Sequence, residues 1–181
     1  MGAERLAWWS RREALGLGLI ATTGLLGFGS ALHGPGGDLP GSAAYSLGSL
    51  SRARRRLADT DVIPFPEIGS YLVGYDATPE SRVAYADSPP GLLLLIGKCT
   101  HLGCGAPWCS SSEWFECPCH GSRFNRVGEY KFGPAVRGLD RYRLRIVDGR
   151  ELVADTSEPV QGPPRGTDTI RQPPAGPHCV G

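Results

Sequence analysis

One short stretch, Cys99 to Phe124, holds five of the six cysteines and two of the four histidines of this 181-residue chain. It begins with CTHLGC and ends with CPCHGSRF, so each half offers a cysteine and a histidine a few residues apart. Thiolate and imidazole side chains bind zinc and the irons of iron–sulfur clusters. The stretch therefore predicts a metal centre built from two short segments of the chain.

Two kinds of metal site fit these ligands. One is a tetrahedral zinc site with two cysteines and two histidines, which also uses closely spaced ligand pairs. The other is a [2Fe–2S] cluster with two cysteines on one iron and two histidines on the other. The C-x-H spacing is tight for a zinc knuckle, and zinc gives no role to the remaining Cys104 and Cys119. These features favour the cluster.

The rest of the chain favours one β-rich domain with appendages. The 26 glycines and 16 prolines indicate many turns rather than a helical bundle, and the net charge of +1 gives no reason to expect nucleic acid as a partner. Three segments with strand character stand between turn signals, the third of them strictly alternating and followed by an Asp-Gly hairpin turn. They are YLVGY (71–75), LLLLIG (92–97) and RYRLRIV (141–147), with ELVAD after the turn.

The N-terminal region predicts a membrane anchor. Residues 14–32 form an uncharged run of 19 residues, long enough to cross a hydrocarbon core of about 30 Å as a helix. Arg5, Arg11 and Arg12 precede the run and place the N-terminus in the cytoplasm. A buried helix and a cleaved signal peptide are the alternatives. The adjacent Arg11 and Arg12 also resemble a twin-arginine export signal, which carries folded proteins.

Two further segments lack the composition of a core. Residues 33–56 are rich in glycine and serine and predict a flexible neck, with SRARRRL (51–57) expected as a solvated basic turn rather than a contact with acidic lipid or a partner subunit. Residues 156–181 contain six prolines and predict an extended tail without its own core.

The two cysteine-histidine segments resemble the two boxes of the Rieske iron–sulfur protein of cytochrome bc- and bf-type quinol-oxidising complexes. The segment of 12 residues between Cys104 and Cys117 is similar to the shorter loop of the bf branch. Gly133-Pro134-Ala135 resembles the proline-containing third loop of that family. The resemblance covers about residues 92–155, and the proline-rich tail has no counterpart in it.

The resemblance implies a fold and a ligand set. The fold is an all-β Rieske-like head, with antiparallel sheets and a small cluster-binding subdomain, on a single N-terminal transmembrane helix. Cys99 and Cys117 would bind one iron of a [2Fe–2S] cluster, His101 and His120 the other, and Cys104 would form a disulfide with Cys119. The implied division of the chain is 1–13 cytoplasmic, 14–32 anchor, 33–56 neck, 57–155 head with cluster loops at 98–135, and 156–181 tail.

The implied function is electron relay in the bacterial cytoplasmic membrane, with the head on the extracytoplasmic side. The subunit would take one electron from quinol, with His120 accepting the quinol's hydrogen bond and proton, and pass it to a c-type haem. Its partners would be a cytochrome b-type subunit, a c-type cytochrome and membrane lipid, and turnover would belong to the whole complex. The alternative is the Rieske subunit of an exported molybdenum oxidase resembling arsenite oxidase. A soluble Rieske ferredoxin or oxygenase domain, and then a structural zinc domain, fit less well.

Two residues beside the second box would tune the cluster. Ser122 matches the family serine that donates a hydrogen bond to a cluster sulfur. Phe124 departs from the tyrosine of many high-potential members, which predicts a lower potential suited to menaquinol, unless Phe124 only packs beside the cluster. For the remaining Cys109 and Cys179, a disulfide is the less favoured expectation, behind two free thiols or one lipidated cysteine.

Overall fold

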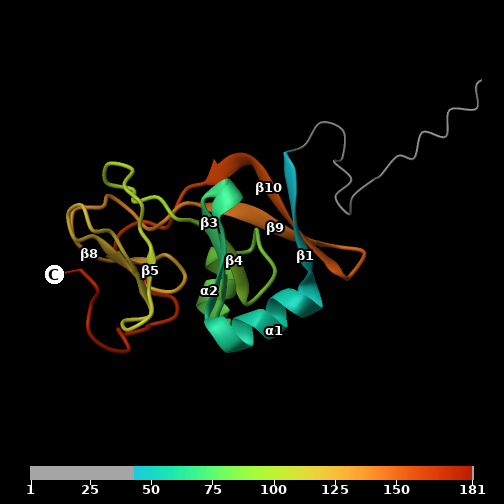
Figure 1. Ribbon diagram of the computed structural model, residues 1–181, viewed down its shortest axis with the longest axis horizontal. Helices are drawn as coiled ribbons and strands as arrows, with labels where there is room; N and C mark the ends of the chain where they lie inside the picture. The colour runs from blue at the N-terminus through green and yellow to red at the C-terminus, as the bar shows by residue number, and fades with distance from the viewer. Residues whose placement is uncertain (1–42, 181) are drawn as a thin grey trace, which may run out of the picture. The chain divides into compact units, whose positions relative to one another are not determined.

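The structure is a computed structural model and describes residues 43–180. Its strands form two antiparallel sheets, accompanied by two short α-helices in the described range (Figure 1). The larger sheet contains β1 (Ala44–Ser49), β10 (Glu151–Val160), β9 (Arg141–Val147), β4 (Leu92–Ile96), β3 (Ser70–Gly74) and β2 (Val62–Phe65), in that spatial order. The smaller sheet contains β5 (Trp108–Cys109), β6 (Trp114–Glu116), β7 (Arg123–Phe124) and β8 (Tyr130–Phe132). The predicted all-β class with antiparallel sheets is confirmed.

Strand β4 lies at the centre of the fold because both of its faces are buried. Leu92 and Leu94 pack in one apolar cluster, and Leu93 and Leu95 pack in a second. Successive side chains of a strand point to opposite faces, so a strand covered on both sides needs a continuous apolar run. The second cluster also contains Cys99, which places the start of the first metal-ligand segment against the large sheet.

The larger sheet curls so that its two edges approach each other. Tyr45 on edge strand β1 and Phe65 on edge strand β2 stack edge to face, with ring centroids 6.3 Å apart. Helix α1 (Leu50–Thr60) packs against β1, β2 and β3 through its apolar face, and its Ala53 is buried.

The predicted flexible neck of residues 33–56 is wrong for its second half, because strand β1 and helix α1 lie there. The head begins at least at Ala44, not at residue 57, because β1 pairs with β10 in the sheet. The basic segment is helical rather than a turn: Leu50, Ala53 and Leu57 supply one apolar face, and the arginines between them are exposed. Apolar residues spaced three and four apart are typical of an amphipathic helix, so the sequence contained a pattern that predicts α1. Residues 33–42 of the predicted neck lie outside the described residues.

Strand β9 departs from the strict alternation of its sequence. Arg141, expected on the solvent face, is buried and forms an ion pair with Asp87 (2.9 Å between Nη2 and Oδ2). Ile146, expected on the core face, is 37% exposed near the tip of the β9–β10 hairpin. The hairpin turn places Asp148 and Gly149 at positive φ, and Arg150 N–H donates to Val147 O.

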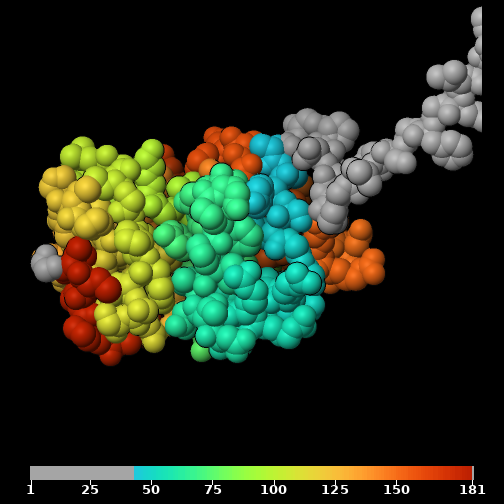
Figure 2. Space-filling model, in the orientation of Figure 1, coloured from blue at the N-terminus to red at the C-terminus, as the bar shows by residue number. Residues whose placement is uncertain are grey.

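The predicted tail is also corrected. Strand β10 continues to Val160 across the expected boundary at residue 156, and the following segment, residues 161–180, packs along the part of the molecule that carries the small sheet (Figure 2). This segment, called the C-terminal tail below, is extended and has no core of its own. A disulfide joins Cys109 to Cys179, so the less favoured expectation for these two cysteines is the one that the structure contains.

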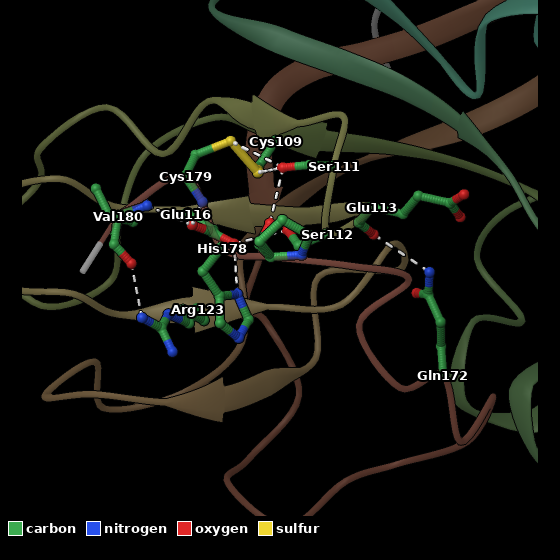
Figure 3. A network of polar contacts seen from close by, with 11 residues as sticks. Cys109, Ser111, Ser112, Glu113, Glu116, Arg123, Gln172, His178, Cys179 and Val180 are labelled. Atoms are coloured by element: carbon green, nitrogen blue, oxygen red, sulfur yellow. Dashed lines mark hydrogen bonds and ion pairs between the residues drawn. A yellow bond between two sulfur atoms is a disulfide. The ribbon is translucent and has the colours of Figure 1, made fainter.

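The end of the tail is held by one buried carboxylate, that of Glu116 (Figure 3). Its Oε1 accepts hydrogen bonds from Ser112 Oγ (2.6 Å) and His178 Nδ1 (2.7 Å). Its Oε2 accepts from the backbone N–H groups of Cys179 (2.8 Å) and Val180 (2.9 Å). Burial raises the pKa of Glu116, but the hydrogen bonds outweigh it and lower the pKa, so the group is ionised at neutral pH.

A second buried carboxylate, Glu129, holds the middle of the tail. Its Oε1 accepts from Thr169 N–H (2.9 Å), Thr169 Oγ1 (2.6 Å) and Tyr85 Oη (3.0 Å), and its Oε2 accepts from Asn125 Nδ2 (2.7 Å). The tail therefore satisfies buried acceptors of the domain and is part of its fold.

None of the helices in residues 43–180 is long and apolar enough to cross a membrane. The predicted anchor, residues 14–32, and the preceding residues 1–13 lie outside the described residues.

Candidate metal centre

The two cysteine-histidine segments form two loops with the same backbone hydrogen bonds. In each loop the N–H of the first cysteine donates to the carbonyl five residues later, and a glycine four residues later donates back to the cysteine carbonyl. The bonds are Cys99 N to Cys104 O (2.7 Å), Gly103 N to Cys99 O (2.9 Å), Cys117 N to Ser122 O (2.8 Å) and Gly121 N to Cys117 O (3.0 Å). Both glycines have positive φ, a conformation that other residues rarely adopt.

The cysteines of the two loops divide into two kinds. Cys104 and Cys119 form a disulfide that joins the loops. Cys99 and Cys117 are free thiols, 3% and 1% exposed, at the base of the loops. The disulfide sulfurs and the Cys117 sulfur lie within 4.8 Å of one another, and the thiols of Cys99 and Cys117 remain available to bind a metal.

The two histidines lie beside each other nearer the surface. The rings of His101 and His120 stand edge to face, with centroids 4.9 Å apart. His120 is exposed, His101 is partly exposed, and Leu102 next to it is 72% exposed. A metal group held by all four residues would therefore have its cysteine side buried and its histidine side close to solvent.

The thiol of Cys99 is in an environment that disfavours a free thiolate. Burial raises its pKa, the neighbouring Cys117 raises it further, and a hydrogen bond from the Ser122 hydroxyl acts in the opposite direction. A thiolate at this position is stabilised when a metal cation binds it. Two adjacent buried thiols with two adjacent imidazoles are the donor set of a histidine-ligated [2Fe–2S] cluster, so the residues present fit that group.

A third loop, residues 133–137, packs against both ligand loops. Ala135 N–H donates to Ser122 Oγ (3.0 Å), and both residues are fully buried. Thr100 Oγ1, in the first ligand loop, donates to Arg137 O (2.7 Å). Gly133 has a φ of +91°, and a Cβ there would lie 2.6 Å from Ser122 Cα, so a side chain at this position would disrupt the contact.

Phe124 lies in the apolar cluster that contains both free thiols. It is fully buried on β7, and its backbone pairs with Phe115 of β6 and Tyr130 of β8. The phenylalanine ring packs beside the proposed ligands and, unlike a tyrosine ring, offers them no hydrogen-bond donor.

Comparison with known proteins identifies the domain. Residues 70–143 match the family model of the Rieske [2Fe-2S] domain. The chain carries a Rieske domain. Domains of this kind hold a [2Fe–2S] cluster of the Rieske type, which agrees with the donor set of the two loops.

Proteins similar to this chain are named as iron–sulfur subunits of cytochrome b6-f complexes or as Rieske proteins. The chain is 27% identical over 156 residues to the chloroplastic cytochrome b6-f complex iron-sulfur subunit of Triticum aestivum, covering 83% of this chain and 70% of that protein. It is 45% identical over 83 residues to the cytochrome b6-f complex iron-sulfur subunit of Microcystis aeruginosa, covering 46% of each chain. A crystal structure of a cyanobacterial plasma membrane Rieske protein from Synechocystis is 23% identical, with a TM-score of 0.42, over 60% of this chain and 97% of that chain.

The structure also places residues around the loops that the sequence analysis did not single out. Thr100 joins the first loop to the third through its hydrogen bond to Arg137 O, and Arg165 of the tail donates to Ala135 O in the same third loop. Thr100 lies between the predicted ligands Cys99 and His101, so its position in the sequence could have marked it as a residue of the site. Arg165 lies 30 residues from its partner Ala135 in a segment without counterpart in the resemblance, and nothing local marks it.

Proposed function

We propose that this chain is the Rieske iron–sulfur subunit of a membrane quinol-oxidising complex of the bc or bf type. It takes one electron from quinol and passes it to a c-type haem. The observation that carries the proposal is the pairing of two buried thiols with two histidine rings near the surface, next to a disulfide that joins their loops. The names of the cytochrome b6-f relatives support the same assignment.

In this proposal Cys99 and Cys117 hold one iron, and His101 and His120 hold the other. When bound, the cluster accepts one electron, and its two neutral imidazole ligands make it a better acceptor than an all-thiolate cluster. The burial of the thiols keeps water from them. The disulfide between Cys104 and Cys119 and the hydrogen bond from Thr100 to Arg137 keep the loops in register.

His120 is the residue proposed to meet the quinol. Its ring is exposed, so the nitrogen that would not bind the metal can lose its own proton to solvent and then accept a hydrogen bond from a quinol hydroxyl. As the quinol is oxidised, that nitrogen takes the hydroxyl proton and later releases it to solvent. The exposed side chain of Leu102 offers an apolar contact beside the rings.

The proposal includes a membrane setting. Residues 14–32 anchor the chain in the bacterial cytoplasmic membrane, the head lies on the extracytoplasmic side, and the segment before Ala43 gives it reach to its redox partners. A cytochrome b-type subunit and a c-type cytochrome are the proposed partners. Copurification with cytochrome b supports this assignment, whereas copurification with a molybdenum subunit supports the alternative oxidase.

Low-temperature EPR of the dithionite-reduced protein, run with metal analysis, tests the proposed function. We expect a rhombic signal with an average g of about 1.9 and about two irons per chain, as for a histidine-ligated [2Fe–2S] cluster. One zinc per chain and no signal would leave only a similarity of ligand spacing.

A substitution at Phe124 tests the tuning of the potential. We expect Phe124→Tyr to raise the midpoint potential, because a phenol can donate to a ligand sulfur and stabilise the added electron. An extra stabilisation of about 1.4 kcal/mol corresponds to about 59 mV for a one-electron couple. Redox titration followed by EPR measures the change, and Phe65→Tyr in β2 is the matched control. An unchanged potential would mean that Phe124 only packs, and the proposed preference for menaquinol would lose its support.

A further inference from the structure

Arg165, a residue of the C-terminal tail, binds the backbone of the third loop. Its Nε–H donates to Ala135 O (2.7 Å), and its Nη2–H donates to Gly133 O (3.1 Å). The guanidinium lies 4.4 Å from the centroid of the Tyr130 ring, and Tyr130 Oη donates to the same Gly133 carbonyl (2.6 Å). Arg165 is thus fixed by a ring on one face and by two carbonyls at its edge.

The peptide group between these two carbonyls is the one that contacts Ser122. Gly133 O and Ala135 O belong to the peptide groups before and after the Pro134–Ala135 peptide, whose N–H donates to Ser122 Oγ (3.0 Å). Holding both neighbouring peptide groups fixes the direction of that N–H. The tail backbone adds to this support, since Gly138 N–H donates to Pro163 O (2.8 Å).

The bond from Ala135 determines what the Ser122 hydroxyl can do. A hydroxyl group has one proton to donate and accepts through its lone pairs. Because Ala135 N–H occupies the acceptor side of Ser122 Oγ, the serine proton is directed away from the third loop. Ser122 is fully buried, and its carbonyl accepts from the N–H of the proposed ligand Cys117 (2.8 Å), which places the serine at the base of the second ligand loop.

We propose that Arg165 is a positioning residue for the metal centre: through the third loop it holds Ser122 in the orientation that donates to the sulfur side of the site. This raises the reduction potential, because a donor aimed at sulfur stabilises the extra negative charge of the reduced state. The inference rests on the proposed function for the presence of the cluster. It goes beyond that function by giving the tail a role in setting the potential.

The chemistry of arginine suits this role better than that of lysine. Its planar fork donates to two carbonyls at once and stacks on an aromatic ring, whereas an ammonium group is a single compact charge. A lysine at this position would keep the positive charge near the site and lose the double contact. Comparing the two substitutions therefore separates positioning from the simple effect of charge.

The test is a double-mutant cycle on the midpoint potential, measured by EPR-monitored redox titration of the full-length chain. The variants are Arg165→Gln, Arg165→Lys, Ser122→Ala and the combination of Ser122→Ala with Arg165→Gln. Arg171→Gln is the control, because Arg171 is an exposed arginine of the same tail. Circular dichroism of each variant checks that it is folded.

We expect Arg165→Gln and Arg165→Lys to lower the potential by similar amounts, less than Ser122→Ala does, with no change in Arg171→Gln. In the Ser122→Ala background, Arg165→Gln should lower the potential no further. An equal fall in both backgrounds would assign the effect to charge and overturn the proposal, as would an unchanged potential. If the glutamine variant does not fold, the lysine variant is measured in the same two backgrounds. A wild-type protein without the EPR signal would instead contradict the proposed function.

Discussion

Replacement of Cys117 by serine is expected to abolish the iron centre, reducing the iron content from about two per chain to none and removing the EPR signal of the reduced protein. Cys117 is 1% exposed and follows β6 directly, so its side chain cannot move away to make room for another ligand. A serine hydroxyl is not ionised at neutral pH and is a poor substitute for a soft thiolate. The measurement is metal analysis together with EPR on purified protein.

The matched control for this substitution is removal of the other disulfide. The double variant Cys109→Ser with Cys179→Ser also loses sulfur atoms, but these link the tail to β5 rather than the ligand loops. We expect this control to retain both irons and the rhombic signal. If the Cys117 variant also retains them, Cys117 is not a ligand and the proposed site is wrong.

The proposed ligands could be predicted from sequence because the information is local. Cys99 and His101 are two residues apart, Cys117 and His120 are three apart, and the chemistry of these residues is independent of the fold around them. Strands β3, β4 and β9 were also predictable, within one residue of their observed ends, since each is a short β-rich run between turn residues.

The role of the tail could not be predicted because its contacts are distant in sequence and largely made by the backbone. Glu116 binds the N–H groups of residues 63 and 64 positions later, and any residue except proline offers such an N–H. Composition showed only that the tail cannot form a core of its own, and this is correct. It could not show that Glu116 and Glu129 are buried and need donors from elsewhere in the chain.

Helix α1 was missed for a different reason. Arg54, Arg55 and Arg56 dominate the composition of this segment, and a cluster of charges suggested a solvated turn. Helix formation depends instead on the spacing of Leu50, Ala53 and Leu57, which turns a narrow apolar stripe toward the curled sheet. The arginines are exposed to solvent, as expected, but they lie on a helix and not on a turn.

Replacement of Glu116 by alanine should produce a large loss of stability. The carboxylate is 2% exposed and accepts four hydrogen bonds, two of them from backbone groups that cannot be replaced by mutation. Loss of this charged acceptor leaves one buried and three partly buried hydrogen bonds unmade, and we expect the free energy of unfolding to fall by about 3 kcal/mol. Urea unfolding followed by circular dichroism under non-reducing conditions measures the change.

Two comparisons separate this effect from general sensitivity to substitution. Glu158→Ala removes an exposed carboxylate on β10 and should change the free energy of unfolding by less than about 0.5 kcal/mol. Glu116→Gln keeps the size of the side chain, but its amide nitrogen has no acceptor lone pair, so two of the four donors lose their partner. It should therefore also be destabilised. A Glu116→Gln variant as stable as the wild type would show that the tail is held by the disulfide between Cys109 and Cys179, and not by the buried charge.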